Sequence, residues 1–389
     1  MQRHSIFLQQ PILPPYRLSF VKQLAKSPLL STTVAYGQEH PRSALRSILN
    51  PDGVSVRTLR NVFVASDRLM TAQMGAVTAF DISHFDTLIC TFDPRIVTNT
   101  LLVLKAKRHH VPVILWGHGI RPRGRFKHLY KRAAEIAEAV ILYSAKGKRE
   151  LQDLGVPEGK MFVAWNSIDT HVIAGVRDGK PLRERDGIIY VGRLVRDKKI
   201  LLLIKGFARA RGSLPAAAHL YIVGSGPMRV PAEKLARDLG IAAHVTFAGE
   251  TYREEEVASW MNRSWISVSP GYIGLSVIHA FAYGLPMIAG DREPHSPEVE
   301  ALLPGKNGEF FTADDPEALA RSLVSIHADP ARLTAMGQAA LVTSDFFSVR
   351  SMVAAFERAV AFAHGEGPPD LGTYGLDIGH GALHGAALP

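Results

Sequence analysis

The sequence predicts an α/β protein of two domains, each built on a parallel sheet covered by helices. Three observations support this prediction. The chain has 389 residues, more than a single hydrophobic core usually holds. Short apolar runs alternate with segments of helical periodicity in both halves of the chain. Residues 171–187 are polar with little apolar periodicity, which is typical of a linker between domains.

The first half contains five short apolar runs that predict strands, at residues 5–8, 32–36, 87–92, 111–116 and 139–143. Pro14-Pro15-Tyr16-Arg17 is expected to open a helix that runs to about Ala25. Further helices are expected near 98–108 and over 126–137. Together these elements predict an N-terminal domain of residues 1–170.

The second half repeats the alternation more clearly. Its expected strands are residues 188–191, 220–223, 245–247, 265–269, 287–289 and 309–311. Asp315-Pro316 and Asp329-Pro330 are typical helix starts, because an N-cap aspartate is followed by proline at the first helical position. We expect a C-terminal domain of residues 188–345 and a C-terminal helix over 346–364. Residues 365–389 are too poor in apolar bulk to pack and are expected to be a disordered tail.

The composition, 47% hydrophobic and 21% charged residues, is that of a soluble globular protein. The single cysteine, Cys90, cannot form an internal disulfide, which favours a reducing compartment and excludes a cysteine-based metal site. No apolar run approaches the roughly 18 residues that span a bilayer, and the N-terminus lacks the apolar core of a secretory signal. The sequence therefore predicts a cytoplasmic protein.

The net charge of +9 is unevenly distributed along the chain. Residues 104–134 contain nine lysines and arginines and no acid, and residues 1–38 contain four and no acid. Such a basic first half is expected to attract an anionic membrane surface or a phosphorylated substrate. Nucleic acid is not expected as a partner, because zinc spacings and RNA-binding motifs are absent. A solvated face without a partner is the alternative, and the basic helix over 126–137 can face either a membrane or its own sheet.

The loop and helix within residues 268–290 form the first candidate binding site. Gly271 and Gly274 allow the backbone to approach a ligand closely, and a helix that opens at Leu275 and Ser276 presents backbone N–H groups to an anion. An ordinary strand-to-helix turn with nothing bound is the alternative. Arg193 and Lys198, which follow the first strand of this half, add two positive charges. The combination suits a diphosphate.

These segments together resemble the successive blocks of the GT-B glycosyltransferases of family 4. The resemblance implies two Rossmann-like domains whose parallel sheets face each other across a cleft. It also implies retaining transfer of a sugar from a nucleotide-diphosphate donor to a glycan or lipid-linked acceptor, with no obligatory metal or other cofactor. The resembling blocks are Trp116-Gly117-His118-Gly119, Asn166-Ser167-Ile168-Asp169, Val191-Gly192-Arg193-Leu194 with Lys198, Val223-Gly224-Ser225-Gly226-Pro227, Phe247-Ala248-Gly249, and Gly274-Leu275 through Ala280, Ala282, Gly284 and Pro286.

The resemblance assigns roles to particular residues. Arg193 and Lys198 are expected to hold the donor diphosphate and to stabilise the charge on the leaving group. His118, in the acceptor-side N-terminal domain, is expected to reach the reacting sugar. The C-terminal domain is expected to bind the donor through Gly192, Gly224, Gly226, Gly249, Gly271, Gly274, Leu275, Ser276, His279 and Glu298.

The sequence departs from the family pattern at three positions. Gly271 and His279 occupy the places of two glutamates that commonly contact the donor sugar and the ribose, and Ser167 replaces a usual glycine. An imidazole at position 279 can still hydrogen-bond ribose hydroxyls. Backbone groups or Glu298 are expected to compensate for Gly271. These departures leave the identity of the donor sugar open.

The leading hypothesis is a glycosyltransferase of cell-surface polysaccharide or glycolipid synthesis, peripheral on the inner face of the cytoplasmic membrane. Two alternatives remain. One is a nucleotide-sugar epimerase or a phosphorylase on the same fold. The other is a GT-B protein that binds nucleotide or membrane without catalysis, which the two missing glutamates favour.

Overall fold

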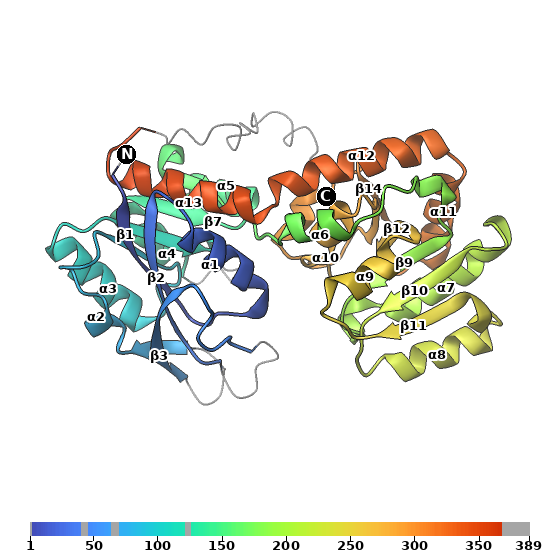
Figure 1. Cartoon of the computed structure of the whole chain (residues 1–389), viewed down its shortest axis with the longest axis horizontal. Helices are drawn as coiled ribbons and strands as arrows, with labels where there is room; N and C mark the ends of the chain where they lie inside the picture. Colours follow the sequence, from blue (N-terminus) through green and yellow to red (C-terminus); the bar gives the residue numbers. More distant parts are fainter. Residues whose placement is uncertain (1, 40–45, 64–69, 121–125, 368–389) are drawn as a thin grey trace. The chain divides into compact units, whose positions relative to one another are not determined.

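The computed structural model describes residues 2–39, 46–63, 70–120 and 126–367, which fold into two units (Figure 1). Of the described residues, the first unit contains those up to Ile168 and those from Val349 to Gly367, and the second contains Asp169–Ser348. The chain therefore passes between the units twice. The backbone N–H of Val349 donates to the carbonyl of Ile168 at 3.3 Å, so the two crossing points are neighbours in space.

The first unit has an eight-stranded sheet in the order β4-β3-β2-β1-β5-β6-β7-β8. Only the β3–β4 pair is antiparallel among the strand pairs of this described sheet. The strands are β1 (His4–Gln10), β2 (Leu30–Gly37), β3 (Ser55–Phe63), β4 (Met70–Met74), β5 (Thr87–Thr91), β6 (Val113–Gly117), β7 (Ala139–Leu142) and β8 (Met161–Val163).

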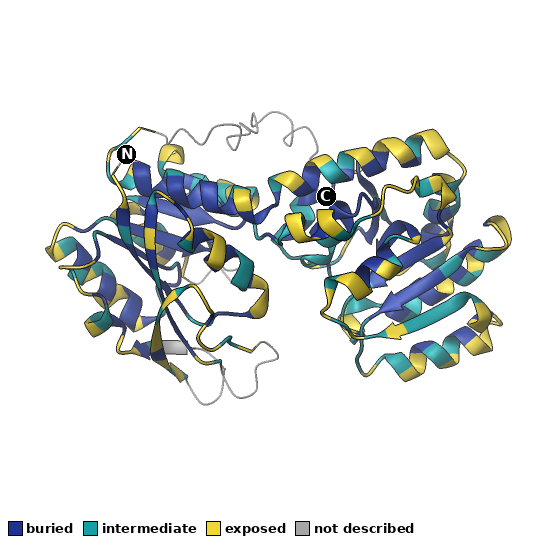
Figure 2. Cartoon of the chain, viewed as in Figure 1, coloured by how far each residue is buried: buried dark blue, intermediate teal, exposed yellow. Residues whose placement is uncertain are grey.

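Helices cover both faces of this sheet, because successive side chains of a strand point to opposite sides. Ile6 and Leu8 of β1 pack in one core, and Phe7 packs in the other. The first core is completed by α1 (Leu18–Ala25) and α13 (Val349–Ala363). The second is completed by α2 (Ala76–Ala79), α3 (Val97–Arg108), α4 (Lys127–Ile136) and α5 (Ala145–Gln152), and both cores lie within the dark-blue interior in Figure 2.

The second unit has a six-stranded parallel sheet in the order β11-β10-β9-β12-β13-β14. The strands are β9 (Gly187–Val191), β10 (His219–Val223), β11 (Val245–Gly249), β12 (Ser264–Ser269), β13 (Met287–Gly290) and β14 (Gly308–Phe311). One core includes α7 (Ile200–Ala210), α8 (Arg229–Asp238) and α11 (Pro316–His327). The remaining helices are α6 (Thr170–Val176), α9 (Glu254–Met261), α10 (Ser276–Ala282) and α12 (Pro330–Phe346).

Each strand predicted from the sequence corresponds to a strand of the structure, and both aspartate N-caps are confirmed. Asp315 accepts from the N–H of Glu317 at 2.8 Å, and Asp329 accepts from the N–H of Arg332 at 2.9 Å. The prediction missed β3, β4 and β8. Most side chains of β3 are exposed or half-exposed, so its polar edge-strand sequence lacks the apolar run that predicts a buried strand.

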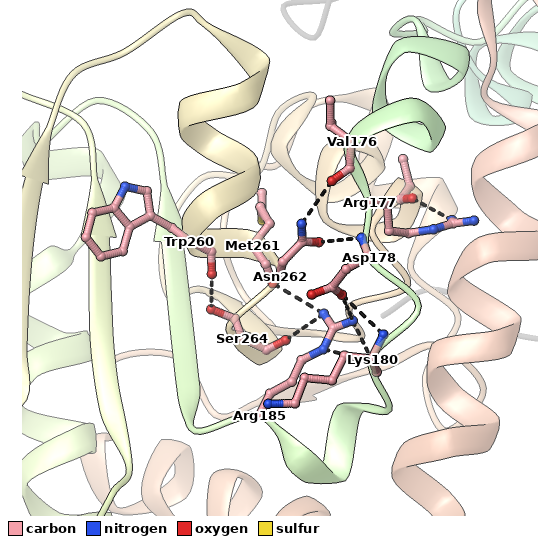
Figure 3. A network of polar contacts seen from close by, with 10 residues as sticks. Val176, Arg177, Asp178, Lys180, Arg185, Trp260, Met261, Asn262 and Ser264 are labelled. Atoms are coloured by element: carbon pink, nitrogen blue, oxygen red, sulfur yellow. Dashed lines mark hydrogen bonds and ion pairs between the residues drawn. The ribbon is translucent and has the colours of Figure 1, made fainter.

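The polar stretch 171–187, where the sequence predicts a linker, is hydrogen-bonded into the second unit (Figure 3). The buried Arg185 guanidinium donates to Asp178 at 2.9 Å and to the carbonyl of Ser264 at 3.2 Å. Asn262, which follows α9, donates to the carbonyl of Val176 at 2.9 Å. The polar composition of this stretch therefore serves a packed network, which apolar periodicity cannot reveal.

Two other expectations concern the chain as a whole. The predicted disorder of residues 365–389 falls mainly on 368–389, which lie outside the described residues. Among the helices that the structure describes, none has both the length and the apolar character needed to cross a bilayer.

Candidate functional site

Glycines stand at the carboxyl ends of three strands of the second unit, directly after β9 and β10 and at the last residue of β11, and their backbones pack on one another. The N–H of Gly192 donates to the carbonyl of Val223 at 3.0 Å, and the N–H of Gly224 donates to that of Gly249 at 2.7 Å. A Cβ on Gly224 would lie 2.0 Å from the carbonyl oxygen of Gly192, and one on Gly226 would lie 2.5 Å from that of Leu194. Both residues also have positive φ, 145° and 149°. Only glycine fits these turns.

The loop around Gly271 packs on the short helix η4 (Arg196–Lys198). A Cβ on Gly271 would lie 2.1 Å from the carbonyl oxygen of Asp197, which accepts the N–H of Tyr272 at 3.0 Å. The Lys198 ammonium donates to the carbonyl of Tyr272 at 2.5 Å and lies 4.5 Å from the centroid of its ring. The structure therefore brings Lys198 and the predicted anion-binding loop together. Gly274 has no described atom within 4 Å of an added Cβ, so its side faces open space.

Lys198 lies among charged groups of both signs. Burial lowers the pKa of its ammonium, Asp197 raises it, Arg193 lowers it and Glu298 raises it, and the net pKa lies below the usual value. The Arg193 side chain is exposed, and among the described residues no hydrogen bond or ion pair holds its guanidinium. Two cations, Arg193 and Lys198, thus act on each other, and the carboxylates of Asp197 and Glu298 also act on Lys198. An anionic ligand would favour the charged form of Lys198.

A second set of contacts holds the same loop from its other side. The N–H of Ile273 donates to Nδ1 of His295 at 3.1 Å, and Nε2 of His295 donates to the carbonyl of Gly290 at 2.8 Å. The Ser296 hydroxyl bonds the carbonyl of Ile273 at 2.8 Å and also the buried carboxylate of Glu298. His295 gives no signal in the sequence, because its partners, Ile273 and Gly290, lie on two other segments.

His279 does not project freely from α10. Its Nε2 lies 2.8 Å from a Glu254 carboxylate oxygen, and the Tyr283 hydroxyl donates to the same oxygen at 2.6 Å. Burial raises the pKa of Glu254, but the hydrogen bonds from His279 and Tyr283 outweigh it, so the net pKa is lowered. A carboxylate thus stands beside position 279 although it comes from α9. Glu254-Glu255-Glu256 at the start of α9 gives no signal of this role, because acidic residues are common at helix N-termini.

The start of α10 carries the other predicted donor-binding residues. Leu275 is the N-cap residue, its carbonyl accepts from the N–H of His279 at 3.0 Å, and Ser276 is the first helical residue. No described side chain caps this helix. Backbone groups at this end are therefore not covered by a capping side chain.

His118 belongs to the first unit and directly follows β6. Its exposed ring lies 4.5 Å from the centroid of the Tyr143 ring. Gly119 has a φ of 81°, and a Cβ on Gly147 would lie 2.8 Å from the carbonyl oxygen of His118. The start of α5 therefore supports the loop that carries His118. The structure groups Arg193, Lys198 and the glycine turns in one unit and places His118 in the other.

One set of residues has the composition of a metal site. Among the described residues, ligand atoms of His4, Asp86 and His364 lie within 4.8 Å of one another. The two imidazoles are stacked, with centroids 3.8 Å apart and 25° between the ring planes. A metal ion lies near the plane of each imidazole that binds it, and nearly parallel rings cannot share such an ion. The cluster lies at the start of β1, whereas the glycine turns and His118 follow strand ends.

Comparison with known proteins agrees with this geometry. Residues 177–343 match the family model described as Glycosyl transferases group 1. A GDP-mannose-dependent alpha-(1-6)-phosphatidylinositol monomannoside mannosyltransferase of Mycolicibacterium smegmatis is 31% identical over 180 residues, 44% of this chain and 46% of the relative. The lipopolysaccharide core biosynthesis glycosyltransferase LpsE of Rhizobium meliloti is 28% identical over 151 residues, 39% of this chain and 42% of the relative. The chain thus matches somewhat less than half the length of each.

The solved structure of Anabaena HepE in complex with UDP is similar over both units, with a TM-score of 0.66 at 15% identity, covering 93% of this chain and 100% of that one. Such low identity establishes the fold alone. The family match covers the glycine turns, η4 and the loop that carries Gly271. The second unit is thus similar to the glycosyl transferases group 1 family over residues 177–343, and the chain as a whole has the GT-B fold.

Proposed function

We propose that this protein is a retaining glycosyltransferase that moves a sugar from a nucleotide-diphosphate donor to a glycan or lipid-linked acceptor. The main observation in support is Lys198, which is half-buried, bound to the Gly271 loop and within electrostatic reach of Arg193. The names of two relatives, a mannosyltransferase acting on a phosphatidylinositol mannoside and a lipopolysaccharide core glycosyltransferase, support a role in cell-surface polysaccharide or glycolipid synthesis.

In this proposal the second unit binds the donor. Negative charge collects on the departing diphosphate as the glycosidic bond breaks, and Arg193 and Lys198 stabilise that charge. The glycine turns at 192, 224, 226 and 249 allow close approach of the nucleotide, and backbone groups at Gly271, Gly274, Leu275 and Ser276 contact its phosphates. These cations exert their largest effect in the transition state, because that is where the charge is greatest.

His279 would contact the ribose. Donation from Nε2 of His279 to Glu254 leaves Nδ1 as a hydrogen-bond acceptor for a ribose hydroxyl. The Glu298 carboxylate lies within electrostatic reach of Lys198 and accepts a hydrogen bond from Ser296. In donor binding it would therefore balance the charge of the Lys198 ammonium. His118 would reach the reacting sugar from the first unit.

The test is donor hydrolysis and transfer with a panel of nucleotide sugars. Lys198→Ala should lower kcat by about a hundredfold or more, as expected for losing one donor that stabilises transition-state charge. Lys205→Ala is the matched control, because Lys205 is an exposed lysine on the neighbouring helix α7, and it should keep full activity. Equal turnover of Lys198→Ala and the wild type would refute the role of Lys198.

The same assay separates the alternatives. A free sugar epimer or a sugar phosphate as product would identify an epimerase or a phosphorylase. Nucleotide binding in calorimetry without turnover on any donor would favour a non-catalytic protein, as the substitutions at Gly271 and His279 suggest.

We further propose that the first unit binds the inner face of the cytoplasmic membrane through α3 and α4. Both helices contribute buried residues to the same core, so they cover the same face of the sheet. Their outward sides expose apolar residues next to lysines and arginines, a combination that favours binding to anionic lipid. The exposed apolar residues are Val97, Leu101, Leu104, Phe126, Leu129 and Ile136, and the neighbouring cations include Lys107, Arg108, Lys127, Lys131 and Arg132.

Flotation with neutral and anionic vesicles tests this membrane proposal. The wild type should float with anionic vesicles and lose most binding at high salt, since exposed charges are screened. Phe126→Ser with Leu129→Ser should weaken binding. Val230→Ser is the control, because Val230 is an exposed apolar residue of the second unit. Flotation that ignores lipid charge would refute the proposal.

A further inference from the structure

Arg17 is a buried arginine at the carboxyl end of the first unit's sheet. It ends the short helix η1 (Pro15–Arg17), which follows β1, and its side chain is packed between aromatic rings. The guanidinium carbon lies 4.4 Å from the centroid of Trp116 and 4.8 Å from that of Tyr143. These rings come from the ends of β6 and β7, the strands beside His118.

The Arg17 guanidinium has no anionic partner among the described residues. Its Nη1 is buried and has no hydrogen-bond partner, and Nε1 of Trp116 is also buried without a partner. Both groups are donors and neither can accept a hydrogen bond. These two buried donors therefore have no acceptor among the described residues, and a negatively charged acceptor would satisfy them best.

Arg185 shows how this fold satisfies a buried guanidinium. That side chain donates to the carbonyls of Lys180, Met261 and Ser264 and to the carboxylate of Asp178 (Figure 3). Among the described residues, the guanidinium of Arg17 instead faces aromatic rings, and its Nη1 has no acceptor. Stacking on two rings offsets part of the cost of burying the charge, but it provides no acceptor for the N–H groups.

The sequence on either side of Arg17 also offers no carboxylate. Residues 1–38 contain no aspartate or glutamate. Helix α1, which begins at the next residue, has no acidic residue in its first turn and no described side chain capping it. The positive end of its dipole adds to the charge of Arg17.

We propose that Arg17 binds a phosphate group of the acceptor substrate. A guanidinium presents a planar fork of donors that matches phosphate oxygens. The Tyr143 ring contacts both the Arg17 guanidinium and the His118 ring, so the phosphate would lie close to the residue assigned to the reacting sugar. The assignment of this phosphate to the acceptor rests on the proposed function, whereas the anion site itself rests on Arg17 and Trp116.

The test is calorimetric titration with glycerol phosphate and, separately, with UDP and GDP. Arg17→Met should weaken glycerol phosphate binding at least about tenfold, as expected for losing a charge-assisted bidentate contact, and should leave nucleotide binding unchanged. Lys198→Ala should do the reverse. Arg17→Met should also unfold at the same or a higher temperature than the wild type, because it removes a buried charge without a partner.

The outcomes separate this inference from the proposed function. Wild-type affinity of Arg17→Met for glycerol phosphate overturns the inference, even if both nucleotides bind. If glycerol phosphate binding depends on Arg17 but neither nucleotide binds, the anion site at Arg17 is supported and the proposed glycosyltransferase function is contradicted. Loss of nucleotide binding in Arg17→Met with phosphate binding intact assigns the residue to the donor and also overturns the inference.

A readout on the wild-type protein, assigned with the conservative variant Arg17→Lys, covers the case in which Arg17→Met does not fold. Arginine Nε–H signals of the labelled wild-type protein should include one that shifts on addition of glycerol phosphate, and Arg17→Lys should remove that signal. Absence of any such shift overturns the inference.

Discussion

Single residues determine how the donor loop is held, and His295 is the clearest example. Its two ring nitrogens have opposite roles, since Nδ1 accepts from the N–H of Ile273 and Nε2 donates to the carbonyl of Gly290. Only the neutral imidazole can do both. The loop that carries Gly271 thus depends on the protonation state of a residue outside it.

We expect His295→Ala to weaken binding of the donor nucleotide about tenfold. The substitution leaves the N–H of Ile273 without its partner, which typically costs about 1–3 kcal/mol. The loop that carries Gly271 is then less ordered, and ordering it on nucleotide binding lowers the affinity. Calorimetry with UDP and GDP measures the effect. His327→Ala is the control, because His327 packs on Trp265 in the same unit without contacting the loop. Equal losses in both variants would contradict a specific role for His295.

The same residue predicts a pH dependence of nucleotide affinity. Burial is the main cause that lowers the pKa of His295 below its usual value of 6.5. The neutral form therefore persists above that value, and affinity should be constant there. It should fall as the pH drops through the lowered pKa, because a proton on Nδ1 faces the N–H of Ile273. Calorimetry from pH 7.5 to 5 should show that the nucleotide affinity of His295→Ala lacks this fall.

At the scale of elements, the segment between α6 and β9 is fixed by one arginine. Arg185 bonds carbonyls on both sides of the β12 start and the carboxylate of Asp178. Burial lowers the pKa of its guanidinium, and Asp178 opposes this effect. This network joins the chain that enters the second unit to the central strand of its sheet.

Arg185→Ala should lower the unfolding free energy of the second unit by about 3–5 kcal/mol, as expected when one partner of a buried charged network is removed. Urea unfolding followed by tryptophan fluorescence can report it, since Trp260 and Trp265 lie in this unit. Arg183→Ala, on the exposed face of η3 (Leu182–Glu184), should change the free energy by less than about 0.5 kcal/mol. Coincident unfolding curves for the two variants would disprove the role of Arg185.

For the whole molecule, four half-buried histidines predict loss of stability in mild acid. Burial is the largest cause that lowers the pKa of His219, His295, His327 and His364. A histidine whose folded pKa lies below 6.5 stabilises the fold above that value, and this stability is lost as the pH falls. Glu357, whose pKa is raised by burial, acts in the opposite direction but is one group against four.

We therefore expect the melting temperature to fall between pH 7.5 and pH 5. Each imidazole that gains a proton only on unfolding contributes up to about 1.4 kcal/mol per pH unit, and 1 kcal/mol corresponds to about 2–4 °C for a unit of this size. Three of the four histidines lie in the second unit, so hydrogen exchange should increase there first. Greater stability at pH 5 would contradict the prediction.

The sequence by itself determined the features that depend on local chemistry. The predicted strands are short apolar runs, and the two N-cap aspartates each precede a proline. The two-unit α/β architecture and the resemblance of the second unit to glycosyl transferases group 1 also followed from blocks read in order along the chain. These signals are visible in sequence because each needs only neighbouring residues.

The tertiary structure decided which distant side chains meet. It paired Glu254 with His279 across 25 residues, bound the Gly271 loop to His295, and left Arg17 against Trp116 without an anion. It also placed α13, from the end of the described chain, in the core of the first unit. Such pairings depend on packing between segments far apart in the chain, and no local pattern of residues encodes them.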